Sequence, residues 1–198
     1  MEIIIRPAAK EDVRIIAEAV AMAIGTASVV HYCGEDYMIA LQEAALHEGT
    51  QYSYTGALVA EVDGQLAGAL CGYDGALLEP LREGTHEVIR KYNPAVRVLD
   101  DETQAGEFYL DSIGVLPQFR GLGIGAMLLS EMTRRAHEAG HQHVALIVDE
   151  DNPSAEKLYT RLGFRRVGTR MFFGHRMWHL QHTLEKSALS VTYCVVDI

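Results

Sequence analysis

The stretch LDSIGVLPQFRGLGIGAMLLSEM (110–132) joins an apolar strand-like run to a helix-like run through three alternating glycines. Arg120 stands directly before Gly121, and Gly123 and Gly125 follow. Glycine leaves the main-chain amides unshielded, and the first amides of a helix have no helical hydrogen-bond partner. The helix dipole adds roughly half a positive charge at that end. The pattern therefore predicts that main-chain nitrogens bind an anion here, and a pyrophosphate fits best.

The composition is that of a globular protein. The chain has 198 residues, of which 48% are hydrophobic and 22% are charged, so a single domain over 1–198 with its own core is expected. The formal net charge of −10 argues against nucleic acid as a partner, because a nucleic-acid binder needs a basic surface. The charge is compatible with a cationic small-molecule partner, although acidity also serves solubility.

Cysteine usage and hydropathy bear on the compartment. The three cysteines, Cys33, Cys71 and Cys194, are scattered and form neither a disulfide framework nor a zinc motif. The N-terminus lacks the pattern of a signal peptide, and the apolar run 15–24 is too short to span a bilayer. We therefore expect a cytoplasmic protein without a membrane partner.

Hydrophobic periodicity and turn residues divide the chain into strands and helices. The pattern predicts strands at 2–8, 107–115, 143–149, 164–173 and 175–184, a hairpin at 55–75, and helices at 10–24, 35–49, 85–92, 124–140 and 153–162. One parallel crossover, 107–149, makes the fold class mixed α/β. Residues 76–105 are expected to lie near a site, with a solvated excursion as the alternative. The run 187–198 reads as a further strand, either at a sheet edge or in a homodimer contact.

The glycine segment has three readings, of which two are known kinds of phosphate loop. A P-loop is excluded because no lysine follows the glycines. A dinucleotide-binding fingerprint matches formally at Gly121, Gly123 and Ala126, with Asp149 as the later acidic residue. In that fingerprint the glycine loop follows its strand directly, whereas LPQFR (116–120) lies between the strand and the glycines here. The single crossover is also followed by hairpin strands rather than by further βα units. A glycine-rich helix start without a ligand stays open as the third reading.

Two motifs carry a family resemblance. The segment V-x-P-x-x-R-G-x-G-x-G and the segment NPSAEKLYTRLGF (152–164) resemble the acetyl-CoA loop and the following motif of the GNAT superfamily of N-acetyltransferases. The resemblance covers about 107–170 and leaves an insertion at 76–105 and a C-terminal extension at 185–198. It implies a central, mostly antiparallel sheet with helices on both faces, in which one parallel pair of strands splays to hold acetyl-CoA.

The resemblance also implies a coenzyme site. The pantetheine arm would pair with the strand 107–115, and the pyrophosphate would lie on the amides of 120–126. Asn152 would contact the coenzyme arm, and its capping of the next helix explains the same residue without any ligand. The residues implied to bind the coenzyme are Ile113, Val115, Arg120, Gly121, Gly123, Gly125, Ala126, Asn152 and Tyr159.

Amine acetylation requires two proton transfers. An alkyl ammonium has a pKa of about 10.4, and the departing thiol one of about 8.5. The resemblance assigns Tyr159 as the acid that protonates the thiolate, with a packed core tyrosine as the alternative. Asp111 and Glu107 share one strand face and are the candidate bases or amine-orienting groups. An ordinary carboxylate is a poor base for an ammonium, so burial or a water relay would be needed, and solvated strand carboxylates remain the alternative.

The sequence thus predicts an acetyl-CoA-dependent N-acetyltransferase in which a primary amine, on a small molecule or a peptide, attacks the thioester directly within a ternary complex. A covalent intermediate is not needed, because no cysteine lies beside a plausible base. No metal is expected, since His175, His179 and His182 do not share one strand face. A non-catalytic acyl-CoA sensor and an NAD(P)-dependent oxidoreductase are the alternatives. A small cationic acceptor is favoured by five acidic residues: Asp100, Asp101, Glu102, Glu107 and Asp111.

Overall fold

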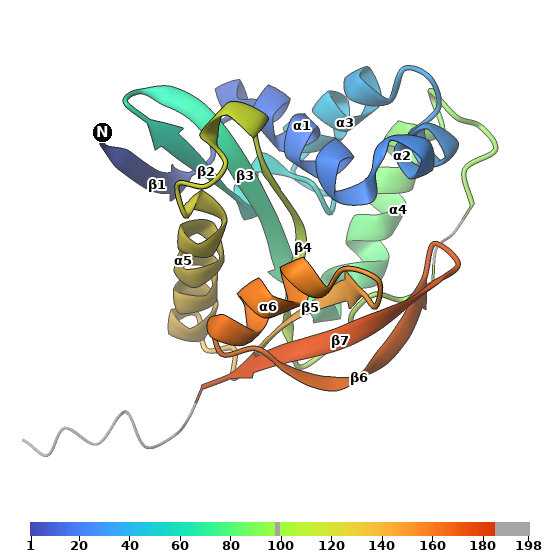
Figure 1. The fold of residues 1–198 in the computed structure, drawn as a ribbon. Coiled ribbons are helices and arrows are strands. Elements are labelled where there is room, and N and C mark those ends of the chain that lie inside the picture. Colours follow the sequence, from blue (N-terminus) through green and yellow to red (C-terminus); the bar gives the residue numbers. More distant parts are fainter. Residues whose placement is uncertain (98–99, 185–198) are drawn as a thin grey trace, which may run out of the picture.

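A computed structural model describes residues 1–97 and 100–184, which form a seven-stranded sheet flanked by helices (Figure 1). The strands are β1 (Ile3–Pro7), β2 (Ala57–Val62), β3 (Gln65–Asp74), β4 (Phe108–Val115), β5 (His143–Asp149), β6 (Arg165–Phe172) and β7 (His175–Thr183). Their order in the sheet is β1-β2-β3-β4-β5-β7-β6. Neighbouring strands are antiparallel except for β4 and β5, which are parallel. The predicted mixed α/β class with one parallel crossover is confirmed.

Helices cover both faces of this sheet (Figure 1). They are α1 (Val13–Ile24), α2 (Thr26–Cys33), α3 (Tyr37–Leu46), α4 (Leu78–Ile89), α5 (Ile124–Glu138) and α6 (Pro153–Arg161). In β2, Val59 belongs to the core cluster formed with α1 to α3, whereas its neighbour Leu58 belongs to the cluster formed with α5. Successive strand residues point to opposite faces, so the two clusters lie on opposite sides of the sheet. The expected placement of helices on both faces is confirmed.

The two parallel strands separate soon after they meet. β4 pairs with β5 only at Phe108 with Val144 and at Tyr109 with Ala145. β4 nevertheless stays paired with β3 as far as Val115, and β5 stays paired with β7 as far as Asp149. The sheet therefore opens into a wedge, and among the described residues no strand pairs with the β5-facing edge of β4 beyond Tyr109. Main-chain groups along that edge are free to bind an extended ligand.

Two helices differ from the expectation. Residues Thr26–Cys33 form the separate helix α2, because Gly25 with φ of +84° ends α1 and turns the chain. Helix α4 begins at Leu78 rather than near residue 85. Pro80 lies in the first turn of α4, where a missing N–H breaks no helical hydrogen bond, so the helix can begin ahead of the predicted range. The predicted strand at 187–198 lies outside the described residues.

The length and hydropathy of the described helices bear on membrane insertion. None of them is by itself long and apolar enough to cross a bilayer. The pair Lys10–Ile24 and Thr26–Cys33 meets the criterion only when taken together, and it is bent by 112° at its break. Ile15, Ile16 and Val20 of this pair are buried in the core, which accounts for its apolar character.

Candidate active site

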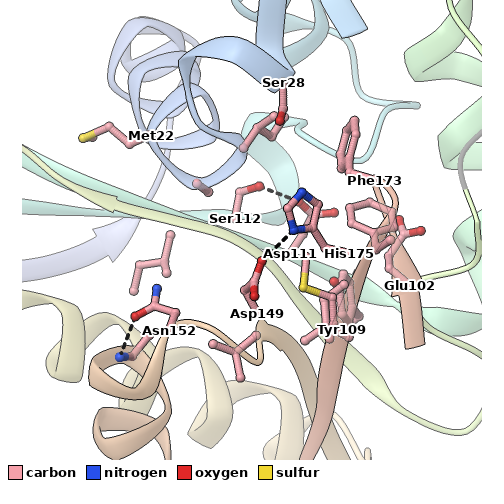
Figure 2. A pocket seen from close by; sticks show the side chains of 18 of the residues that line it. Met22, Ser28, Glu102, Tyr109, Asp111, Ser112, Asp149, Asn152, Phe173 and His175 are labelled. Atoms are coloured by element: carbon pink, nitrogen blue, oxygen red, sulfur yellow. Dashed lines mark hydrogen bonds and ion pairs between the residues drawn. The ribbon is translucent and has the colours of Figure 1, made fainter. Parts of the chain in front are cut away.

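A cavity of about 550 Å³ lies where β4 and β5 separate. Its wall comes from α1, β4, β5, α6, β7 and the connection between α4 and β4 (Figure 2). A volume of this size is typical of a small-molecule site. Representative lining residues from these elements are Met22, Asp111, Ile147, Tyr159, Met177 and Glu102.

A β-bulge in β4 shapes the centre of the cavity. Leu70 of β3 pairs with Ile113, whereas Gly72 pairs with Leu110, so β4 has one residue more than β3 in this interval. Leu110 and Ile113 both pack on the α5 side, although a regular strand would place them on opposite faces. The two residues between them, Asp111 and Ser112, both line the cavity. The bulge therefore places a carboxylate and a hydroxyl next to each other at the site.

Asp111 has the electrostatic character that a base for an amine needs. Burial raises the pKa of its carboxyl from 3.8 to about 7, and the charge of Glu102 acts in the same direction. Ser112 Oγ donates a hydrogen bond of 2.6 Å to Asp111 Oδ1, and this bond offsets part of the rise in the pKa. The role of base requires a carboxyl with a raised pKa, and the half-buried Asp111 provides one.

Tyr159 and Asn152 belong to α6 and its cap, and both line the same cavity. The Tyr159 ring packs edge-on against Phe164 at 6.3 Å, and burial raises the pKa of its phenol. Within residues 1–97 and 100–184, no group hydrogen-bonds to the Tyr159 hydroxyl. Asn152 Oδ1 accepts a hydrogen bond of 3.1 Å from the Ala155 amide, which caps α6 (Figure 2). The capping function is thus observed, and the coenzyme contact of Asn152 stays a prediction.

The glycine loop presents a series of bare amides. Gly121 and Gly123 have φ of +83° and +78°, conformations that disfavour any side chain, and a Cβ at either position would meet no atom within 4 Å. Met127 N donates to Gly123 O at 3.1 Å and begins the hydrogen bonding of α5. Within the described part of the chain, the amides of 121–126 have no hydrogen-bond partner. The main chain here has the form of an anion-binding site at a helix start.

Residues on either side of this loop connect it to the wedge. The Arg120 side chain is exposed, and its Nε donates a hydrogen bond of 3.1 Å to the carbonyl oxygen of Val115. Its Nη2 lies 3.7 Å from the sulfur of Met22, which lines the cavity. Ile113 also lines the cavity, whereas Val115 and residues 120–126 lie outside its lining. The predicted coenzyme residues therefore form a strip that runs from the cavity to the start of α5.

Glu107 is placed differently from the other predicted catalytic residues. Its side chain is 1% exposed and does not line the cavity. Thr103 and Gln181 donate hydrogen bonds to its carboxylate, and His179 Nε2 lies 3.1 Å away. Burial alone would raise the pKa of Glu107, but these hydrogen bonds outweigh it and lower the pKa. This is the position of a structural carboxylate, so the geometry gives no support to a role as base.

The three histidines considered as metal ligands lie apart. Within the part of the chain that the structure describes, no three His, Cys, Asp or Glu side chains are grouped to hold a metal ion. Each histidine has a partner of its own: His175 with Asp149, His179 with Glu107 and His182 with His137.

The ion pair between Arg82 and Glu102 at the cavity wall was not predicted from the sequence. Glu102 and Arg82 are only 2% and 4% exposed, and Arg82 Nη2 donates a hydrogen bond of 2.7 Å to Glu102 Oε2. Gln51 and Tyr73 donate hydrogen bonds of 2.7 and 3.0 Å to Glu102 Oε1. The acidic run around Glu102 and the position within 76–105 were local signals of a nearby site. No local signal pairs Glu102 with Arg82, because the partners come from separate segments.

The splayed parallel pair, the free amides at the start of α5 and the cavity beside them together define an acyltransferase fold. The model of the acetyltransferase (GNAT) family matches residues 26–164, and the chain belongs to this family. The resemblance carried by the two sequence motifs is thereby confirmed.

Solved structures agree with this assignment. A crystal structure described as an acetyltransferase has a TM-score of 0.78 and 35% identity, covering 92% of this chain and 100% of the other. An N-acetyltransferase from Staphylococcus aureus Mu50 has a TM-score of 0.76 and 27% identity, covering 90% and 99%. YncA from Salmonella typhimurium, a putative acetyltransferase solved with acetyl-CoA, shares the fold at a TM-score of 0.59 and 21% identity, covering 94% of this chain and 96% of the other.

Curated relatives match over shorter regions. A mycothiol acetyltransferase of Parafrankia sp. (strain EAN1pec) is 48% identical over 61 residues, which is 31% of this chain and 18% of that protein. A mycothiol acetyltransferase of Pseudarthrobacter chlorophenolicus is 28% identical over 77% of this chain, and the match covers 41% of that protein. The chain thus matches only part of these proteins.

Proposed function

We propose that this protein transfers the acetyl group of acetyl-CoA to a primary amine by direct attack within a ternary complex. The observation that carries the proposal is the position of Asp111. Its carboxyl has a pKa of about 7 and lines the same cavity as Tyr159, at the point where the β4 edge becomes free. A base with a pKa near neutral and an acid in one cavity are the groups that amine acetylation needs.

The coenzyme would be held mainly by the main chain. The free amides of 121–126 suit a pyrophosphate, and the unpaired edge of β4 beyond Tyr109 suits the amide groups of a pantetheine arm. Arg120 adds a positive charge beside the loop. Bound acetyl-CoA supplies the activated thioester. The coenzyme contacts of Ile113, Val115 and Asn152 belong to the same proposal.

The reaction uses one proton transfer to Asp111 and one from Tyr159, and exchange with solvent completes the proton balance. Asp111 accepts a proton from the ammonium, and the neutral nitrogen attacks the thioester carbonyl. The new C–N bond forms, the C–S bond breaks, and Tyr159 donates its proton to the departing sulfur. The proton lost by the nitrogen in forming the amide passes to solvent. Tyr159 regains a proton from solvent, and Asp111 releases its own to solvent, which restores both groups for the next turnover.

The pKa of Asp111 determines how well this can work. An ordinary carboxyl with a pKa near 4 lies about six units below an alkyl ammonium, which has a pKa of about 10.4. A carboxyl at about 7 lies roughly three units below it, so the proton transfer is less unfavourable by about 4 kcal/mol. Burial of Asp111 thus turns a poor base into a usable one.

The acceptor does not follow from the relatives. The mycothiol acetyltransferase of Parafrankia sp. matches over 31% of this chain, and its name therefore describes that protein only. What supports a cationic acceptor is the cavity itself, where Asp111 faces the space beside Tyr159.

Release of free coenzyme A thiol with a panel of amines tests the proposal. We expect turnover with at least one primary amine, together with stabilisation by acetyl-CoA of about 2.7 kcal/mol at one hundred times its Kd. Stabilisation by acetyl-CoA without thiol release from any amine would favour the non-catalytic sensor. Stabilisation by NAD or NADP alone would favour the oxidoreductase, which the single parallel strand pair makes structurally unsuitable.

A further inference from the structure

We infer that the acceptor is a primary amine on an uncharged apolar body, and that the buried Arg82–Glu102 pair excludes acceptors bearing a carboxylate. This inference rests on the proposed function and names the substrate class of the same cavity. Figure 2 shows Asn152 at one end of the cavity and Glu102 with Phe173 at the other. The end with Glu102 is therefore the acceptor end, away from the residues proposed to hold the coenzyme.

The positive charges at this cavity are already engaged. Among the lining residues that belong to the described part of the chain, only Arg82 and His175 can carry a positive charge. Arg82 Nη1 donates a hydrogen bond of 2.7 Å to Asp101, and Nη2 donates to Glu102. His175 Nδ1 lies 3.3 Å from Asp149 Oδ2. An acceptor carboxylate would therefore find no free cation, and its desolvation would go uncompensated.

The negative charges differ in how far they are satisfied. Glu102 receives hydrogen bonds from Arg82, Gln51 and Tyr73, which engage both of its oxygens. Asp111 accepts a hydrogen bond from Ser112 at Oδ1. The Tyr73 hydroxyl also lowers the pKa of the Asp111 carboxyl, but its hydrogen bond is donated to Glu102. Asp111 thus has fewer hydrogen-bond partners than Glu102 and is the carboxylate better placed to receive an ammonium. An anionic acceptor would face Asp111 and Glu102 together, and like charges disfavour binding.

Apolar side chains also line the cavity. Phe172 at the end of β6 and Phe173 in the turn before β7 line it together with Met177 and Ile147. Phe173 has an unusual φ of +49°, and its ring packs edge-on against Tyr32 of α2 at 5.8 Å. This contact packs the hairpin turn against α2. Burial of an aromatic or aliphatic body against these apolar side chains contributes about 25 cal/mol per Å².

A matched set of three acceptors tests the inference on the wild-type protein. We expect kcat/KM for 2-phenylethylamine to exceed that for L-phenylalanine by about 10²-fold or more, because the site leaves the carboxylate unpaired. L-Phenylalaninamide keeps the bulk of the carboxylate but not its charge, so it should recover most of this loss. Equal or higher kcat/KM for L-phenylalanine would overturn the inference.

Replacing Glu102 by glutamine tests the role of the ion pair. Glu102→Gln leaves Arg82 with one carboxylate partner fewer, so the kcat/KM of L-phenylalanine relative to 2-phenylethylamine should rise by about tenfold. Glu83→Gln is the matched control, because Glu83 lies on the same helix as Arg82 and is paired with Arg90 on the surface. An unchanged ratio in folded Glu102→Gln, or an equal change in Glu83→Gln, would remove the ion pair from acceptor selection.

The outcomes of these experiments separate the two levels of proposal. If Glu102→Gln does not fold, as circular dichroism would show, the three acceptors on the wild-type protein still decide the inference. If acetyl-CoA stabilises the protein but no amine releases thiol, the proposed function fails and takes the inference with it. If amines react and L-phenylalanine matches 2-phenylethylamine, the proposed function stands and only the inference fails.

Discussion

The two ends of the wedge offer different kinds of groups to a ligand. At the start of α5, residues 121–126 offer bare main-chain amides, and three of these six residues are glycines. At the acceptor end, side chains determine the site: Asp111 on the β4 bulge and the Arg82–Glu102 pair beside it. The first end depends on backbone conformation over a few consecutive residues. The second depends on contacts between segments far apart in the sequence.

Coenzyme binding is proposed at the main-chain end and the proton transfers at the side-chain end, so substitutions can separate the two. A main-chain site is insensitive to most substitutions, because every residue carries the same amide, except where φ requires glycine. A side-chain site changes its selectivity with single substitutions, since each charge is balanced by specific partners. We therefore expect variants of the two ends to affect different measurable quantities.

The largest effect is expected from Asp111→Asn, which alters only the acceptor end. Asparagine keeps the shape of aspartate but cannot accept the amine proton, so kcat/KM should fall by about 10³-fold. In the wild-type protein, kcat/KM should rise with pH up to about 7, where Asp111 becomes ionised, and the variant should lack this rise. Steady-state kinetics from pH 5 to 9 measure both. A parallel loss of acetyl-CoA affinity would mean that the two ends are not separate.

Tyr159→Phe should have the next largest effect. Phenylalanine preserves the edge-on packing against Phe164 and removes only the proton donor. We expect a decrease of about 10²-fold in kcat with little change in the Kd of acetyl-CoA, measured by calorimetry and thiol release. An unchanged kcat would assign Tyr159 to packing alone.

Gly123→Ala addresses the coenzyme end and has a matched control. Gly123 and Gly140 lie at opposite ends of α5, both with positive φ and with open space where a Cβ would stand. Alanine at either position should cost about 1–2 kcal/mol of stability through backbone strain. Only Gly123→Ala should also weaken acetyl-CoA binding, by about tenfold, because it displaces the free amides. Equal affinities in the two variants would argue against the main-chain site.

The smallest effect is a change in stability with pH. Because the folded pKa of Asp111 is raised from 3.8 to about 7, the folded state binds more protons than the unfolded state between these values. Ionisation of Asp111 therefore lowers the stability of the wild-type protein as pH rises through this window. The Asp111→Asn protein lacks that loss of stability. The Tm of the variant minus that of wild type should therefore be larger at pH 8 than at pH 4, and each kcal/mol of stability corresponds to about 2–4 °C. Calorimetry at the two pH values would contradict this if the difference stayed constant.

Much of the fold could be predicted because its signals are local. The strand 107–115, the glycine segment and the helix after it follow from periodicity and turn residues within about thirty positions. The prediction was wrong at the start of α4, which was expected near residue 85 and begins at Leu78, with Pro80 in its first turn. The bulge at Asp111 and Ser112 had no sequence signal, because it depends on the register that β4 adopts against β3.

The sequence alone determined the proposed coenzyme end, since positive φ at glycines and unpaired amides at a helix start are properties of neighbouring residues. The tertiary structure alone decided which carboxylate faces the cavity. Glu107 and Asp111 occupy equivalent positions in the strand pattern. In the structure, Glu107 accepts a hydrogen bond from Gln181 of β7, whereas the Asp111 carboxyl is desolvated and its pKa is raised further by the charge of Glu102. Burial and charge pairing depend on residues brought together from distant segments, and no local pattern encodes them.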